Sequence, residues 1–235
     1  MNEELLIEQM FQVLISGDRG MARRISDTAF ECGISPQKMS LDIYWPLLDN
    51  VHTLYRQDQI SKLAQQYATR TLSTLVSQAH MKYEIKESNG KNICMFSGPT
   101  ELEDLHGRMV SDLLESEGYE VRYGGGNICY DDILEEIHAQ KPDVLVMFAS
   151  GPQDAPMIRQ LIDHIRSVGA YPDMQIAVGG GIFNRAPGLA EEIGADLWAA
   201  NPTELIDLLE NCSDIRADLS DRTVGRSRGQ NVAAA

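Results

Sequence analysis

The sequence has few cysteines and no long apolar run, and each shortage excludes a class of protein. Its four cysteines, Cys32, Cys94, Cys129 and Cys212, are scattered and form no Cys-x-x-Cys pair. This spacing excludes a disulfide scaffold and a zinc knuckle, and it indicates a reducing compartment. No stretch reaches the ~18 apolar residues that a membrane-spanning helix needs. The start of the chain is acidic and amphipathic, unlike a signal peptide, so the sequence predicts a cytoplasmic protein with no membrane partner.

Basic residues are scarce relative to acidic ones. The chain has 20 Lys and Arg against 35 Asp and Glu, which gives a formal net charge of -15. Nucleic-acid phosphates are bound by clusters of Lys and Arg, and no basic stripe offsets the acidity here. The sequence therefore predicts no direct nucleic-acid partner. Apolar residues make up 43% of the 235 residues, which is enough for the core of one or two domains.

Residues 1–86 show the periodicity of helices and none of the alternation of strands. Leu6, Met10 and Leu14 recur at helical spacing, and three more apolar patterns of this kind follow up to residue 76. Pro46 lies inside the third pattern and predicts a kink. Four helices over this length predict an antiparallel helical bundle as the first domain.

After a linker at 87–91, strands and helices alternate. Apolar strands are predicted at 92–96, 119–123, 143–148, 174–178 and 196–200, with amphipathic helices between them. This pattern predicts a doubly wound, five-stranded parallel sheet in an α/β domain that spans 91–212. Residues 213–235 are polar and predict a disordered tail.

The carboxyl ends of the predicted strands carry polar or glycine-rich loops, and ligands of such sheets bind at these ends. Two triple-glycine runs would let a flat ligand approach the backbone, and tight turns are the alternative explanation of these glycines. The candidate binding residues on these loops are Glu103, Asp104, His106, Gly125, Gly126, Asn127, Ser150, Gly179, Gly180 and Gly181.

This order of domains resembles the cobalamin-binding module, in which a four-helix cap precedes a flavodoxin-like domain. The resemblance covers residues 1 to about 212, and Gly179-Gly180 is among the matching positions. Pro99 and the run Arg108-Met109-Val110 are similar to the first loop of the B12-dependent photoreceptor branch. The resemblance implies adenosylcobalamin or another corrinoid, held between the cap and the α/β domain. In the family the nucleotide tail is buried at a Ser-x-Leu segment after the third strand, and this chain departs from it by reading Phe148-Ala149-Ser150.

The first loop departs from the family motif Asp-x-His-x-x-Gly, whose histidine is the lower ligand of cobalt. The alignment puts Glu103 at the histidine and His106 at the glycine. Three arrangements stay open. Asp104 and His106 form a displaced pair with His106 on the metal, or the corrinoid binds without a protein ligand, or the pocket takes haem or a different ligand.

The helical domain departs from the photoreceptor branch as well. That branch carries a tryptophan and a Glu-His pair above the corrin, and the register puts Tyr55, Gln65 and Gln66 at these positions. The resemblance implies contact with the upper face of the cofactor, while core packing and a solvated helix face are the alternatives. His52, three residues before Tyr55, is a weaker candidate for an upper metal ligand. The other helical histidines, among them His80, are predicted at the surface.

Two functions follow from the resemblance. The first is a sensor or regulator, light-responsive as in the photoreceptor branch, that acts through a protein partner such as a transcription factor. The alternative is a corrinoid methyl carrier whose partner is a methyltransferase, and a haem-binding or ligand-free degenerate module is a third reading. No catalytic triad or Walker loop is recognisable, so the sequence predicts no enzyme beyond a carrier subunit. It leaves a homo-oligomer open.

Overall fold

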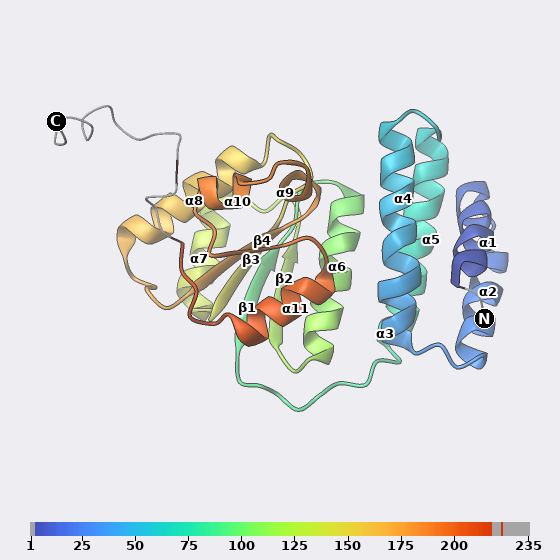
Figure 1. The fold of residues 1–235 in the computed structure, drawn as a ribbon, viewed down its shortest axis with the longest axis horizontal. Helices are drawn as coiled ribbons and strands as arrows, with labels where there is room; N and C mark the ends of the chain where they lie inside the picture. The colour runs from blue at the N-terminus through green and yellow to red at the C-terminus, as the bar shows by residue number, and fades with distance from the viewer. Residues whose placement is uncertain (1–2, 218–221, 223–235) are drawn as a thin grey trace. The chain divides into compact units, whose positions relative to one another are not determined.

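The computed structural model describes residues 3–217 and Arg222 (Figure 1). Its internal contacts divide it into two compact units. The helical unit consists of Met1–Asn89 and Thr100–Gly118, and the α/β unit consists of Gly90–Pro99 and Tyr119–Ala235.

The elements of the helical unit are α1 (Glu3–Ser16), α2 (Arg19–Glu31), α3 (Pro36–Lys38), the π-helix η1 (Met39–Tyr44), α4 (Trp45–Arg56), α5 (Lys62–His80) and α6 (Glu101–Ser116). The unit thus contains the four helices expected from the sequence, the third of which is divided into α3, η1 and α4, and it also contains α6. The side chains of Asp18, Ser35 and Ser61 accept hydrogen bonds from the first turns of α2, α3 and α5, as N-caps do. Although α6 follows β1 in the chain, it belongs to this unit.

A π-helical turn, η1, lies directly before α4 and Pro46. The Trp45 N–H donates to the Ser40 carbonyl, five residues earlier. In a regular α-helix the proline ring would collide with the carbonyl four residues before it. The wider π turn re-routes the local hydrogen bonds next to a residue that has no N–H to donate.

The α/β unit holds a single parallel sheet among the described residues, in the strand order β2-β1-β3-β4-β5. The strands are β1 (Asn92–Phe96), β2 (Glu120–Gly125), β3 (Val144–Phe148), β4 (Gln175–Gly179) and β5 (Leu197–Ala199). The helices are α7 (Tyr130–Gln140), α8 (Ala155–Val168), α9 (Gly181–Arg185), α10 (Leu189–Ile193) and α11 (Pro202–Asn211). The predicted fold class is thus confirmed.

One face of this sheet carries a core shared with α7, α8 and α10, to which Leu145, Met147 and Ile176 contribute. In the inner strands β1, β3 and β4 the alternate residues, such as Met95 and Val146, are buried as well, whereas the edge strand β2 has no buried residue. Strands buried on both faces have no polar side, which is why they read as continuous apolar runs in the sequence.

The start of the predicted tail is held by hydrogen bonds in the α/β unit. The Gln175 side chain donates to the carbonyls of Cys212 (2.8 Å) and Ile215 (3.2 Å), and the Ala217 N–H donates to the Asp196 carboxylate (2.8 Å). The disorder predicted for 213–235 therefore does not extend to 213–217, and apart from Arg222 the rest lies outside the described residues. Among the described helices, none combines the length and the apolar character that crossing a membrane requires.

Candidate functional site

Two loops at the carboxyl ends of β1 and β2 are tied into one rim. The Ser97 N–H donates to the Gly125 carbonyl (2.9 Å), and the Tyr123 hydroxyl donates to Ser97 Oγ (2.9 Å). Asn127, whose backbone is left-handed with φ 59°, donates its amide to the Pro99 carbonyl (3.0 Å). The predicted residues Gly125 and Asn127 thus shape the rim through contacts within the α/β unit.

A cavity of about 230 Å³ opens beside this rim. Its wall is mostly apolar and comes from strand ends, α7 and α8, with few polar groups at its edge. The lining residues are Phe96, Ser97, Gly98, Pro99, Gly125, Asn127, Ile128, Ile133, Met147, Phe148, Asp154, Met157, Ile158 and Leu161. Pockets that enclose a whole drug-sized ligand measure roughly 300–1,000 Å³, so this cavity suits one apolar substituent of a larger ligand.

Two of the predicted glycines are required by backbone packing. A Cβ on Gly126 would lie 2.2 Å from the Gly98 carbonyl oxygen. A Cβ on Gly180, where φ is +100°, would lie 2.4 Å from the Ala149 carbonyl oxygen. Neighbouring loops therefore occupy the space beside these glycines, and tight packing explains both without a ligand.

The other predicted residues of this edge also have neighbours inside the unit. A Cβ on Gly179 would lie 3.0 Å from the Phe148 ring, and one on Gly181 would lie 2.5 Å from the Arg185 guanidinium. That guanidinium donates to the Ser150 carbonyl. Gly179 and Gly181 of the second glycine run thus pack against side chains, while the cavity lies beside the first run.

Glu103, which stands where the resembled family has its histidine, closes the start of α6. Its carboxylate accepts hydrogen bonds from the Thr100 N–H (3.1 Å) and hydroxyl (2.7 Å), and its own N–H donates to Thr100 Oγ1 (3.2 Å). This is a capping box. The spacing Thr-x-x-Glu is the signal in the sequence that could have identified it. Asp104 shares the first turn, where the helix dipole favours negative charge.

His106 has both ring nitrogens engaged inside the helical unit. Nδ1 lies 3.0 Å from the Leu102 carbonyl oxygen, and Nε2 lies 3.0 Å from the Asp49 carboxylate. The ring also meets Trp45 edge-on at 4.8 Å. Both oxygens only accept hydrogen bonds, so both bonds form together only when the imidazole carries two protons. Metal ligation by His106 stays a prediction, and it would require Nε2 to leave Asp49.

The residues predicted to face the cofactor from the helical domain converge on a hollow of about 160 Å³ in the helical unit. His52, Tyr55, Gln65 and Gln66 all line it. The Lys62 ammonium donates to Gln65 Oε1 (2.8 Å) and lies 4.9 Å from the centre of the Tyr55 ring.

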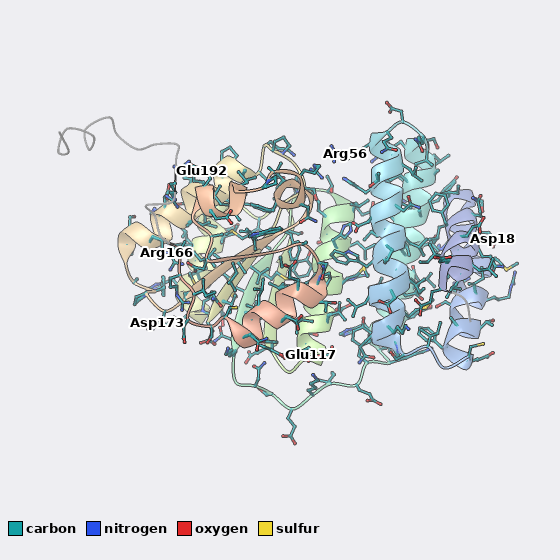
Figure 2. All side chains as sticks on the ribbon, viewed as in Figure 1. Asp18, Arg56, Glu117, Arg166, Asp173 and Glu192 are labelled. Atoms are coloured by element: carbon teal, nitrogen blue, oxygen red, sulfur yellow. The ribbon has the colours of Figure 1, made fainter. Side chains whose placement is uncertain are left out.

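The basic residues of this hollow were not among the predicted ones. Lys62 begins α5 and Arg56, labelled in Figure 2, ends α4. Both line the hollow, together with Glu101. The sequence shows that both lie near the ends of predicted helices, close to Gln65 and Gln66, but no motif identifies them as site residues.

Residues 93–206 match the family model described as the B12 binding domain. The resemblance of this part of the chain to a cobalamin-binding domain is thereby confirmed. The match supports cobalamin or another corrinoid as the cofactor.

The curated relatives are corrinoid proteins of Methanosarcina species. Monomethylamine corrinoid protein 1 of Methanosarcina mazei is 21% identical over 212 residues, which are 86% of this chain and 94% of that protein. Dimethylamine corrinoid protein 1 of Methanosarcina acetivorans is 26% identical over 106 residues, and the chain spans 49% of its length. It spans 62% of dimethylamine corrinoid protein 3 of Methanosarcina mazei.

A solved structure shares the fold across both units. The Methanosarcina barkeri monomethylamine corrinoid protein superposes with a TM-score of 0.77 at 16% identity, covering 88% of this chain and 98% of that one. At this identity the likeness shows the fold alone.

The described residues offer a cavity for the nucleotide tail of a corrinoid, but the first loop offers no free imidazole for its cobalt. The apolar cavity beside the rim suits the base of a nucleotide tail, and Phe148 of its wall lies where the resemblance places that tail. The first loop, however, offers Glu103 in place of an imidazole, and its carboxylate is held in the capping box.

Proposed function

We propose that the chain is a corrinoid-binding methyl carrier that works with a separate methyltransferase. The supporting observation is the alignment with a monomethylamine corrinoid protein over 86% of this chain, which runs through both units. Because the curated relatives are methylamine corrinoid proteins, the comparisons favour this function over the light-responsive regulator. They likewise favour a corrinoid over haem.

In this proposal the α/β unit binds the cofactor by its tail. The apolar wall formed by residues such as Met147 and Ile158 excludes water from the base, and the joined loops at Ser97 and Asn127 keep the mouth of the cavity open. When bound, the corrinoid supplies a reducible cobalt that accepts a methyl group and passes it on. The chain's own residues bind and orient the cofactor.

Of the three arrangements that the sequence leaves open, we favour binding without a lower ligand from the first loop. The carboxylate of Glu103 is held by Thr100, and both nitrogens of His106 are held by Leu102 and Asp49. Either residue would have to give up hydrogen bonds to reach a metal, and buried polar groups that lose their partners cost about 1–3 kcal/mol.

Reconstitution with hydroxocobalamin tests the proposal. We expect one corrinoid per chain by absorbance, methylation by iodomethane after reduction of the cobalt, and methyl transfer to a thiol once a corrinoid-dependent methyltransferase is added. Protein loaded with adenosylcobalamin should keep the same hydrodynamic radius in darkness and in light. A corrinoid-loaded protein that no methyltransferase accepts, and whose radius changes on illumination, would show a regulator instead.

A further inference from the structure

A second cluster of potential metal ligands lies at the other end of the helical unit from the hollow. His80 ends α5, while Asp112 and Glu115 lie three residues apart on one face of α6. One ligand atom from each lies within 4.8 Å of the other two. Along α5, His80 is about 22 Å from Gln65 at the rise of an α-helix. In Figure 2, Glu117 marks this end of the unit and Arg56 marks the opposite one.

The geometry of His80 differs from that of an ordinary histidine–carboxylate pair. Its Nδ1 lies 3.3 Å from the Asp112 carboxylate, yet this buried nitrogen forms no hydrogen bond within the part of the chain that the structure describes. Nδ1 and the carboxylate oxygen are thus close without pointing at each other. At His106, by contrast, Nε2 at 3.0 Å from Asp49 forms a hydrogen bond.

Asp112 is a costly residue to leave without a cation. It is 9% exposed, so water solvates its charge poorly. Arg108 does not neutralise it by direct contact, because its guanidinium donates to the carbonyl (2.7 Å) and hydroxyl (3.1 Å) of Ser73. A buried carboxylate beside an unpaired imidazole nitrogen suits a third, positive partner.

We propose that His80, Asp112 and Glu115 bind a divalent metal ion of the zinc type and so join the end of α5 to α6. Imidazole and carboxylates are ligands of zinc, and two ligands about 2.0–2.1 Å from a tetrahedral ion lie roughly 3.3–3.5 Å apart. The 3.3 Å between His80 Nδ1 and Asp112 Oδ1 agrees with this separation. Glu115 Oε2 lies 4.0 Å from Nε2 of the same ring. Its side chain is 39% exposed, so it is free to turn toward Nδ1 and complete the site, with water in the fourth position.

Titration of the full-length protein with zinc chloride, after chelator treatment and without corrinoid, tests the site. We expect one zinc ion per chain by calorimetry and a rise in melting temperature. Mutating a residue that only hydrogen-bonds to a metal ligand already weakens metal binding about 10–100-fold. H80Q and D112N alter the ligands themselves, so they should weaken zinc binding at least as much. The control H138Q alters a histidine of the α/β unit that is hydrogen-bonded to Tyr171, and it should keep the wild-type affinity.

Two results would overturn the site. One is the absence of zinc binding by the wild-type protein, and the other is an affinity that H80Q and D112N share with the wild type. If D112N fails to fold, the more exposed position 115 decides, because E115Q should weaken zinc binding and an unchanged affinity would refute the proposal. Corrinoid binding is measured separately, so the carrier function and the zinc site stand or fall independently.

Discussion

The cavity of the α/β unit and the hollow of the helical unit are lined by different kinds of residue. The cavity of the α/β unit has an apolar wall that includes Phe96 and Ile158, whereas the hollow of the helical unit is lined by groups such as Lys62 and Gln65. An apolar wall gains affinity by removing ligand surface from water, and hydrogen-bonding side chains mainly fix the orientation of the ligand. We therefore expect the first to dominate corrinoid affinity and the second to adjust it.

The largest expected effect is a difference in reactivity between two cysteines of the α/β unit, the buried Cys94 and the exposed Cys129. Burial raises the pKa of the Cys94 thiol to about 11, while Cys129 is exposed. Only the thiolate is alkylated, and an ordinary thiol has a pKa of about 8.5, so Cys94 should react with iodoacetamide at least ~100-fold more slowly than an unperturbed thiol. Its thiolate fraction increases only as the pH approaches 11.

Peptide mass spectrometry at a pH of about 8.5, the ordinary pKa of a thiol, checks this, with urea-unfolded protein as the control in which all cysteines react alike. Equal labelling of Cys94 and Cys129 in the folded protein would mean that the core below the cavity opens readily.

Filling the apolar cavity should have the next largest effect. Met157 lines it and is 45% exposed, so M157W is tolerated by the fold while its indole takes up the space. Overpacking costs about 1–3 kcal/mol, which corresponds to roughly 5–150-fold weaker corrinoid binding. The matched control is V168W, an exposed position on the same helix that does not line the cavity. Absorbance titration should separate the two, and equal affinities would place the tail elsewhere.

Substitutions of Glu103 test whether this residue caps α6 or binds cobalt. E103A removes the carboxylate from the capping box and should lower the free energy of unfolding by about 1 kcal/mol. E103Q should retain most of the stability, since glutamine also serves in a capping box. Urea unfolding measures both. We expect neither variant to alter the absorbance spectrum of bound hydroxocobalamin, and a spectral change in E103Q would show that Glu103 touches the metal.

The smallest effect on corrinoid affinity is expected from the hollow of the helical unit. K62M removes the donor to Gln65 and the cation beside Tyr55, interactions that contribute about 0.5–1 kcal/mol each at exposed sites. We expect the corrinoid affinity of K62M to fall about threefold, or ~0.6 kcal/mol. K82M removes a comparable cation 4.1 Å from the Phe30 ring and should leave the affinity unchanged. Identical affinities for both variants would remove the hollow from the binding site.

The histidines show where prediction from sequence stops. His106 stands out because a family motif lies nearby, whereas the polar neighbours of His80 predict a surface residue. The structure engages both nitrogens of His106 and leaves a buried nitrogen of His80 without a hydrogen bond among the described residues. Whether an imidazole is available to a metal depends on partners such as Asp49 and Asp112, which are distant in sequence, and neither periodicity nor motif spacing reports them.

The sequence by itself determined the parallel sheet, its strands to within about two residues, and the identity of the glycine-rich edge. These features depend on local patterns, because strands buried on both faces are apolar throughout and helices repeat every 3.6 residues. Only the tertiary structure decided that Gly126 and Gly180 make room for backbone, that Glu103 closes a helix and that α6 packs in the helical unit. Such outcomes depend on which groups meet in space, and the same residue types would have served a ligand equally well.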